Sequence, residues 1–341
     1  MTTPDPILVT GAAGFIGFHL ARRLAEQGRS VVGLDNLNAY YDPRLKQARL
    51  DRLASFSSFQ FENLDLADRA GMAKLFARHR FPSVVHLAAQ PGVRHSLVDP
   101  HAYADANLAG FLNVLEGCRH SGCRHLVYAS SSSVYGANAR LPFDTSDNVD
   151  HPLSLYGATK KANELMAHAY AHLFALPATG LRFFTVYGPW GRPDMAMWLF
   201  TKAIIEGTPV RLFNHGRMRR DFTYIDDVIE AMARLIDKPP AGDPQWSGTP
   251  DPARSRAPWR VYNIGNNRPV EVTEVVRLIE QAVGKPAIRE PAPMQPGDVP
   301  ETCANVDDLA AAVGFAPKTP IAEGIARFVD WYRGYAEGKL A

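Results

Sequence analysis

The sequence is poor in cysteine: its 341 residues include only Cys118, Cys123 and Cys303. Three cysteines at these spacings do not make a disulfide framework or a zinc site, so we expect no metal and three reduced, buried thiols in a cytoplasmic protein. The chain also lacks any apolar run near the roughly 20 residues that cross a bilayer. Its first five residues, Met-Thr-Thr-Pro-Asp, show no basic segment followed by an apolar one. We therefore expect neither a membrane partner nor a signal peptide.

An excess of charge of one sign is missing as well. There are 37 lysines and arginines against 35 aspartates and glutamates, a formal net charge of +2. A strongly basic surface would attract nucleic acid or an anionic membrane, and this balance predicts neither partner. The length and the hydrophobic share of 46% indicate a globular protein with a large core and two domains.

The strongest motif lies at the start of the chain. Residues 7–10, Ile-Leu-Val-Thr, predict a buried parallel strand, and the turn Gly-Ala-Ala-Gly-Phe-Ile-Gly of residues 11–17 leads from it into a helical pattern. A strand, a glycine turn and a helix in this order are typical of dinucleotide binding. Gly11 allows the tight turn, Gly14 lets a pyrophosphate approach the helix N-terminus, and Gly17 allows close packing of the helix on the strand. The alternative is a tight turn without a ligand.

A carboxylate follows at the end of the second predicted strand. Residues 30–34 are mostly apolar and lead to Asp35, about 20 residues beyond the glycine turn, where an acidic side chain can bind both ribose hydroxyls of an adenosine. The next residues, Asn36-Leu37-Asn38, include no arginine for a 2′-phosphate, and this favours NAD over NADP. The alternative is a solvated aspartate in a loop.

Strands and helices alternate regularly through the first half of the chain. Further strands are predicted at 59–61, 84–87, 125–129 and 179–184, and helices at 100–120 and 156–173. This alternation predicts an α/β fold: a Rossmann-type doubly wound parallel sheet with helices on both faces, and a smaller C-terminal α/β domain that binds the substrate. We assign residues 1–187 with 221–240 and 259–268 to the first domain, 188–220 with 269–341 to the second, and 239–258 to a proline-rich surface loop.

Small and polar residues follow several of these strands, at the ends where ligands bind in open α/β sheets. Asp65 with Leu66 can flank an adenine ring, and Ala88 with Ala89 allow close passage of a cofactor. The four serines of residues 130–133 can bind a sugar hydroxyl or a carboxylate. A loop carboxylate without a ligand and a solvated serine-rich loop are the alternatives.

A tyrosine and a lysine are spaced for proton transfer. Tyr156 and Lys160 lie four residues apart in a predicted helix, so their side chains share one face. A neighbouring ammonium group lowers the pKa of a phenol, which can then take a proton from a substrate hydroxyl. The spacing alone is weak evidence, because it occurs by chance on many helices.

Two segments of the second half suggest contacts with a phosphorylated ligand. Arg217, Arg219 and Arg220 are clustered, which suits bidentate recognition of phosphate, although an exposed basic turn is equally compatible. Residues 291–300 are rich in proline and contain Gly297-Asp298, and we expect this loop to close over a ligand.

Taken together, these motifs resemble one enzyme superfamily over nearly the whole chain. The glycine turn, Asp35, the Ser-x-x-Val-Tyr-Gly of residues 131–136, the Tyr156/Lys160 pair and the Arg-Asp-Phe of residues 220–222 resemble the extended short-chain dehydrogenase/reductases, and more closely their NAD-dependent nucleotide-sugar epimerases. Residues 34–42 and 185–195 are similar to those of UDP-glucuronate 4-epimerases, which interconvert UDP-glucuronate and UDP-galacturonate.

The resemblance implies a mechanism. Tyr156 would be the base for the hydroxyl on carbon 4 of the sugar, Ser131 the catalytic serine, and Lys160 would lower the pKa of Tyr156 and hold the nicotinamide ribose. A hydride would leave carbon 4 for bound NAD, and the 4-keto sugar would swing over and take it back on its other face. The resemblance also implies a homodimer, built from the helices near 100–120 and 156–173, with a role in polysaccharide biosynthesis.

The resemblance implies two sets of binding residues. Those for NAD are Gly11, Ala13, Gly14, Phe15, Ile16, Gly17, Asp35, Asn36, Asn38, Asp65, Leu66, Ala88, Ala89, Gln90, Asn107, Ser130, Tyr156, Lys160, Phe183 and Val186. Those for the UDP-sugar are Arg94, Ser131, Ser132, Ser133, Tyr156, Thr185, Arg192, Arg211, Phe213, Arg220, Gln295 and Asp298.

Departures from relatives bear on the substrate. Ser132 and Ser133 stand where related dehydratases have Asp-Glu and where decarboxylases have a glutamate before the Val-Tyr-Gly. Serine does not ionise in the working pH range, which argues against dehydration and less firmly against decarboxylation. Thr185 replaces the asparagine of many relatives and, with Ser132 and Arg192, is expected to bind the carboxylate on carbon 6.

Gln295 stands where galactose epimerases have an arginine for the diphosphate, so Arg220 would neutralise more of the diphosphate charge.

Three alternatives to the uronate epimerase stay open. They are a 4-epimerase of a neutral UDP-hexose, a UDP-glucuronate decarboxylase, and a non-catalytic NAD-sensing regulator on the same fold. Such regulators often lack the tyrosine and lysine pair.

Overall fold

The computed structural model describes residues 5–247 and 251–338, and its main layer is a seven-stranded parallel sheet. The strands follow the order β10-β6-β5-β4-β1-β2-β3. They are β1 (Ile7–Thr10), β2 (Val31–Asp35), β3 (Phe59–Asn63), β4 (Ser83–His86), β5 (His125–Ser131), β6 (Ala178–Phe183) and β10 (Trp259–Ile264). Because β1 and β4 are neighbours, the strand order reverses at this pair, and a crevice forms beyond their carboxyl ends. The predicted doubly wound α/β fold is confirmed.

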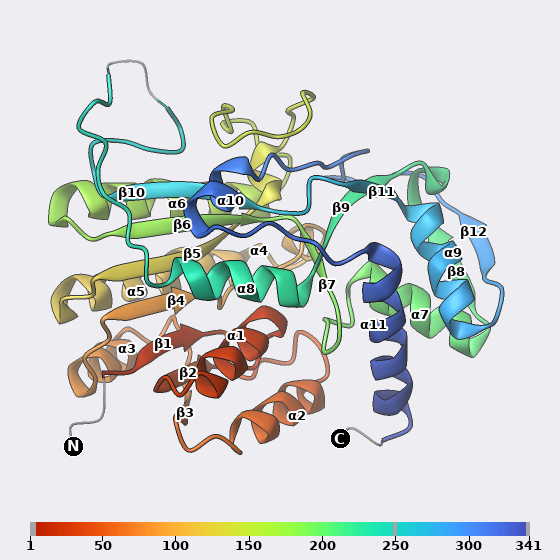
Figure 1. Cartoon of the computed structure of the whole chain (residues 1–341), viewed down its shortest axis with the longest axis horizontal. Coiled ribbons are helices and arrows are strands. Elements are labelled where there is room, and N and C mark those ends of the chain that lie inside the picture. The colour runs from red at the N-terminus through yellow and green to blue at the C-terminus, as the bar shows by residue number, and fades with distance from the viewer. Residues whose placement is uncertain (1–4, 248–250, 339–341) are drawn as a thin grey trace.

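Helices cover both faces of this sheet (Figure 1). One face carries α1 (Phe15–Glu26), α2 (Pro43–Leu53) and α8 (Ile225–Leu235), and the other carries α3 (Arg69–Arg78), α5 (Gly110–Ser121) and α6 (Leu155–Phe174). The side chains of successive strand residues are buried in the two cores on opposite faces of the sheet. Ile7 and Val9 belong to the core that includes α1, whereas Leu8 belongs to the core that includes α5. Burial on both faces explains why the strands are continuous apolar runs in the sequence.

The remaining elements form a second lobe beyond the carboxyl ends of the main sheet (Figure 1). It contains β7 (Thr185–Tyr187), β8 (Pro209–Leu212), β9 (Arg219–Tyr224), β11 (Pro269–Glu271), β12 (Ile288–Pro291), α7 (Ala196–Glu206), α9 (Val272–Val283) and α11 (Ile321–Ala336). The central strand β9 pairs with β7 and β11, and β8 pairs with β12. Between these elements the chain returns to add β10 to the main sheet, whereas α10 (Asp307–Val313) packs on α8 and β10.

Two predicted elements differ in the structure. The helix predicted at 100–120 is broken into α4 (Pro100–Tyr103), a π-helical turn (Ala104–Ala109) and α5. The wider turn is held from inside by Asn107, whose buried side chain bonds to neighbouring segments. The strand predicted at 179–184 ends at Phe183, and Thr185 begins β7 in the other sheet. This switch directs the chain from the main sheet into the second lobe.

The cluster at 217–220 is not a simple exposed turn, because Arg219 and Arg220 begin strand β9. The next residue, Asp221, is fully buried, and its carboxylate accepts N–H bonds from Asn266, Asn267 and Ala304 at 2.7–3.0 Å. These bonds fix the start of β9, and with it the direction of the arginines, against two other segments.

The structure also bears on the predicted state of the cysteines and on the predicted surface loop at 239–258. All three cysteines are free thiols and buried, as predicted. Residues 248–250 of the predicted surface loop lie outside the described residues; in its described part, Ala253 and Ala257 pack into the core.

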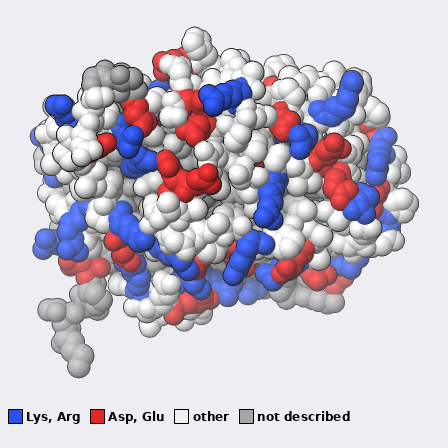
Figure 2. Space-filling view, turned by 45° about the horizontal axis from the view of Figure 1, so that its top comes forward, with Lys and Arg blue, Asp and Glu red and all other residues white. Residues whose placement is uncertain are grey.

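The described surface and helices bear on possible partners. In Figure 2, acidic and basic side chains are interspersed over the face that it shows. Within residues 5–247 and 251–338, none of the helices has the length and apolar character needed to cross a membrane.

Candidate active site

A cavity of about 820 Å³ lies between the carboxyl ends of the main sheet and the second lobe. Six main-sheet strands, from β1 to β6, contribute residues at or just beyond their ends, namely Gly11, Asp35, Leu64, Leu87, Ser131 and Phe183. The second lobe contributes Arg211, Phe213 and Arg220. Of the residues predicted to bind NAD or the sugar, all except Ala13, Asn107 and Gln295 line this cavity.

The glycine turn is packed so tightly that side chains are excluded. Gly11 has a φ of +72°, and a Cβ there would lie 2.8 Å from the backbone nitrogen of Ala88. A Cβ on Gly17 would lie only 2.0 Å from the carbonyl oxygen of Gly11. Gly14 is the N-cap of α1 and has no side chain that could accept the N–H groups of the first turn. These groups and the helix dipole therefore suit an anion such as a diphosphate.

Asp35 ends β2 with its carboxylate at the cavity wall. Oδ1 accepts a hydrogen bond from the Leu37 backbone N–H at 2.9 Å and lies 3.4 Å from the Lys46 ammonium. Both contacts use the same oxygen, which leaves Oδ2 as an acceptor for a ligand hydroxyl. Lys46 was not predicted, although it stands in the helical segment that follows Asp35.

Helix α6 carries Tyr156 and Lys160 one turn apart, as predicted. Its N-terminus is fixed by Ser154, whose hydroxyl accepts the Gly157 N–H at 3.0 Å. Lys160 is 2% exposed and donates to the carbonyl oxygen of Ala129 at 2.9 Å. Burial lowers the pKa of its ammonium group to about 8.

The lowering of the Tyr156 pKa by Lys160 stays a prediction. Burial raises the pKa of Tyr156, whereas a hydrogen bond with Ser131 and the positive charge of Arg192 act to lower it. The lysine ammonium is turned to the Ala129 carbonyl instead. The helix spacing therefore predicted correctly that both residues line the cavity.

Arg192 lies in the loop after β7 and lines the cavity together with Tyr156. Its guanidinium binds Asp194 through two hydrogen bonds of 2.9 and 2.8 Å, and the Tyr40 hydroxyl donates to the same carboxylate at 3.2 Å. Arg192 lines the cavity together with Ser132 and Thr185, so the three residues expected around a carboxylate face the same space. Tyr40 and Asp194 were missed as site residues, although both belong to segments that carry the family resemblance.

A second group of charges lies where the second lobe meets the main sheet. Arg94 pairs with Asp298 at 2.9 Å, and its guanidinium lies 4.4 Å from the centre of the Phe213 ring. Burial lowers the pKa of Arg220, and the charges of Asp298 and Arg94 also act on it. The loop containing Asp298 thus touches residues from both parts of the molecule. Arg211 pairs with Glu290 at 3.4 Å, partly neutralising its charge.

The three predicted residues that do not line the cavity form hydrogen bonds to neighbouring residues. Asn107 accepts the Gln90 N–H at 2.8 Å and donates to the Gln90 carbonyl and to the Thr159 hydroxyl, both at 3.1 Å. The carbonyl oxygen of Gln295 accepts the Asp298 N–H at 3.2 Å, a backbone bond that does not use the side chain. Ala13 is fully buried and accepts a bond from an arginine through its carbonyl oxygen.

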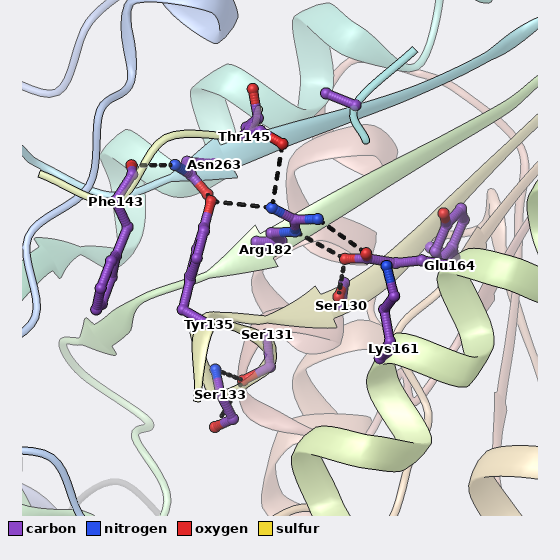
Figure 3. Close-up of polar contacts among 12 residues, drawn as sticks. Ser130, Ser131, Ser133, Tyr135, Phe143, Thr145, Lys161, Glu164, Arg182 and Asn263 are labelled. Atoms are coloured by element: carbon purple, nitrogen blue, oxygen red, sulfur yellow. Dashed lines mark hydrogen bonds and ion pairs between the residues drawn. The ribbon is translucent and has the colours of Figure 1, made fainter. Parts of the chain in front are cut away.

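A buried polar network supports the serine cluster from behind (Figure 3). Ser130 donates to Glu164 at 2.7 Å, and Arg182 binds the same carboxylate with bonds of 2.8 and 2.9 Å. Arg182 also donates to the Tyr135 hydroxyl at 3.1 Å, and Tyr135 donates to Asn263 at 2.7 Å. The network therefore ties the turn after β5 to α6, β6 and β10. Sequence reasoning missed Glu164, Arg182 and Asn263 because they belong to no short motif.

Comparisons with known proteins agree with this geometry. The family model described as the NAD dependent epimerase/dehydratase family matches residues 7–265. The chain belongs to this family. Protein CapI of Staphylococcus aureus is 55% identical over 96% of the chain and 98% of its own length, and a probable UDP-glucuronate 4-epimerase of Rhizobium meliloti is 49% identical over 95% and 96%.

Solved structures include a relative with the same architecture. The UDP-glucuronic acid 4-epimerase of Bacillus cereus, in complex with UDP-glucuronic acid and NAD, superposes with a TM-score of 0.86 at 32% identity, over 97% of this chain and 99% of that one. The cavity of this family member fits the dinucleotide in the family's description. The uncapped α1 terminus suits its diphosphate, and the carboxylate of Asp35 suits its adenosine ribose.

Proposed function

We propose that the chain is an NAD-dependent UDP-sugar 4-epimerase that interconverts UDP-glucuronate and UDP-galacturonate. One observation carries the proposal: Arg192 and Tyr156 line the same cavity, and the positive charge of Arg192 acts to lower the pKa of the phenol. In a uronate only carbon 5 separates the reacting carbon 4 from the carboxylate. An enzyme for this substrate needs its carboxylate partner close to its base, and the shared cavity of Arg192 and Tyr156 supports this assignment.

Tyr156 takes the proton from the hydroxyl on carbon 4, and Ser131 stabilises the phenolate by hydrogen bonding. NAD, when bound, would supply the acceptor and donor for the hydride of carbon 4. Lys160, which bonds the Ala129 carbonyl, would hold the nicotinamide ribose. The phenol then returns the proton to the new hydroxyl, so that Tyr156 regains its initial state.

The carboxylate requires protection during the reaction. Oxidation at carbon 4 makes a β-keto acid, which readily loses carbon dioxide. We propose that Arg192, Thr185 and Ser132 hold the carboxylate in a plane that disfavours cleavage of the carbon–carbon bond. Ser132 and Ser133 provide no acid for loss of a hydroxyl, which argues against dehydration.

The two binding sets follow the two ends of the cavity. We propose that residues lining it near the glycine turn, Asp35 and Asp65 bind NAD. Arg94, Arg211, Phe213, Arg220 and Asp298 would bind the UDP part of the substrate. This division supports the proposed domains, with 1–187, 221–240 and 259–268 for the dinucleotide and 188–220 with 269–341 for the nucleotide sugar.

A second candidate, the 4-epimerase of a neutral UDP-hexose, is favoured by one contact. Asp194 already occupies one edge of the Arg192 guanidinium, and so competes for the charge that a uronate needs. The test offers the purified protein UDP-glucuronate and UDP-glucose separately, without added NAD, and identifies the products by NMR. UDP-galacturonate as the main product supports the proposal. UDP-galactose alone, a UDP-pentose, or no conversion of either sugar would refute it.

The setting of the enzyme is also a proposal. UDP-galacturonate is an activated sugar, and we propose that it serves polysaccharide biosynthesis in the cytoplasm. We further propose a homodimer formed through α5 and α6, because Leu165 and Leu173 on α6 are 59% and 66% exposed. Light scattering that gives the mass of one chain at micromolar concentration would contradict the dimer.

A further inference from the structure

Arg49, on α2, is a buried cation without a carboxylate partner. Its side chain is fully buried, and within the described residues it forms no ion pair with an acidic group. Burial also lowers the pKa of its guanidinium group, whereas Tyr41 and the negative charge of Asp35, which is not hydrogen-bonded to it, act to raise it. Burying a charge without an opposite charge is costly, so the contacts of this side chain must offset a large penalty.

These contacts join two turns that are far apart in the sequence. Nη1 donates to the carbonyl oxygen of Ala13 and to the hydroxyl of Tyr41, both at 2.7 Å. Nη2 donates to the carbonyl oxygens of Trp190 and Gly191 at 2.6 and 3.3 Å. One planar group therefore connects the glycine turn of residues 11–17 with the turn that precedes Arg192. Within the described part of the chain, its Nε–H has no acceptor.

The turn before Arg192 has an unusual backbone that needs support. Trp190 has a φ of +63°, in the left-handed region that is disfavoured for residues with a Cβ. Gly188 has a φ of +146°, and a Cβ there would lie 2.5 Å from the Ile225 side chain. The Trp190 ring is buried, with its centre 5.5 Å from that of Phe18 on α1. Packing thus fixes the ring of Trp190, and the hydrogen bond from Arg49 fixes its carbonyl group.

We propose that Arg49 is a positioning residue that fixes the Arg192 loop relative to the dinucleotide turn. It would thereby keep the Arg192 guanidinium in line with Tyr156 and with the uronate carboxylate. The inference rests on the proposed function, because it takes a uronate as the substrate. Lysine at this position would keep the charge but could not present two parallel N–H donors to each side, since it lacks the planar fork.

A double-mutant cycle tests this role. Arg49→Lys, Arg192→Ala and the double variant are compared with the unmodified enzyme for kcat and KM with UDP-glucuronate, bound NAD and thermal stability. Arg44→Lys is the matched control, because Arg44 lies on the same helix with its side chain 89% exposed. We expect Arg49→Lys to raise KM about tenfold in the unmodified enzyme but less than about twofold when Arg192 is already alanine. Arg44→Lys should change neither KM nor stability.

An equal rise in KM in both backgrounds, or a loss of stability with KM unchanged, would overturn the positioning role. If Arg49→Lys does not fold, Tyr41→Phe, which removes one acceptor of the guanidinium, is taken through the same cycle. The rise in KM should again depend on Arg192, and additive effects would again overturn the role. An unmodified protein that leaves UDP-glucuronate unchanged would instead refute the proposed function, so the two failures are distinguishable.

Discussion

The surroundings of Tyr156 both oppose and favour loss of its proton. Burial raises the pKa of this phenol, and the hydrogen bond with Ser131 and the charge of Arg192 act in the other direction. A base for a sugar hydroxyl works best when its pKa is near the working pH. The chain's own residues that favour the phenolate are therefore those that would also touch the sugar.

Replacing Tyr156 with phenylalanine removes only the oxygen of the proposed base. We expect Tyr156→Phe to lower kcat by about 1,000-fold, within the range for loss of a general base, with little change in KM. Steady-state kinetics with UDP-glucuronate measure this. Tyr170→Phe is the control, because Tyr170 lies on the same helix with its hydroxyl bonded to Glu116, away from the cavity. Full turnover by Tyr156→Phe would rule out the phenol as the base.

The charge of Arg192 predicts a shift of the pH profile. Activity should rise with pH as Tyr156 loses its proton. Because the positive charge of Arg192 lowers the pKa of the phenol, its removal should raise that pKa further. We therefore expect the rising limb of kcat/KM against pH to move to higher pH in Arg192→Ala. A limb that stays in place or moves to lower pH would show that Arg192 does not act on the base.

At the scale of the elements, the ion pair between Glu164 and Arg182 joins α6 to β6 beneath the serine cluster (Figure 3). Both side chains are buried, with exposures of 2% and 0%. Their bonds to Ser130 and Tyr135 extend the pair to both ends of the turn that carries Ser131. Tyr156 and Ser131 thus lie on elements that share one internal support.

Breaking this pair should cost much more than breaking a surface pair. Glu164→Gln would leave the Arg182 charge buried without a counter-charge, and we expect it to lower the free energy of unfolding by about 3–5 kcal/mol. Glu26→Gln breaks the exposed pair with Arg22 and should cost less than about 1 kcal/mol. Urea unfolding of both variants measures the difference. Equal and small losses would show that the buried pair does not hold these elements together.

Sequence patterns predicted most elements but not the contacts between them. The strand at residues 7–10 and the helix at 272–283 follow directly from apolar runs and periodicity. The π-helical turn at 104–109 was missed, because its cause is the bonding of Asn107 to Gln90 and Thr159, outside the helix. A pattern within one segment carries no information on such partners.

For the candidate site, too, residues in local motifs were predicted and residues with distant partners were not. Gly11, Asp35 and Tyr156 were found because their motifs are short and local, and all line the cavity. Arg182 and Arg49 were not, since their partners lie 8 to 142 residues away and are in part backbone carbonyls. Short sequence motifs therefore predicted the residues that line the cavity better than the residues that hold those side chains in place.

At the scale of the whole molecule, the cavity extends from the glycine turn at the main sheet to Phe213 and Arg220 of the second lobe. The ion pair of Arg94 with Asp298 connects a loop after β4 with the loop that follows β12. A substrate that spans both ends would bind through its sugar at one and its diphosphate at the other. Substitutions at the two ends should therefore differ in their selectivity.

Arg220→Ala tests this division. Because the diphosphate is common to all UDP-sugars, we expect KM to rise about tenfold for UDP-glucuronate and by the same factor for UDP-glucose, where that sugar is turned over or binds. Arg192→Ala, in contrast, should weaken UDP-glucuronate alone. Kinetics and calorimetric titration with the two sugars measure both effects. If the Arg220 variant discriminates between the sugars, its assignment to the diphosphate is wrong.

The most direct test of the whole account follows the hydrogen on carbon 4. UDP-glucuronate carrying deuterium at this carbon is incubated with the purified enzyme in ordinary water without added NAD, and the product is examined by NMR and mass spectrometry. We expect UDP-galacturonate that keeps its deuterium on carbon 4, because the hydride would leave and return within one closed site. Product that has lost the label to solvent, or inversion accompanied by exchange at carbon 5, would contradict transfer to and from a resident dinucleotide.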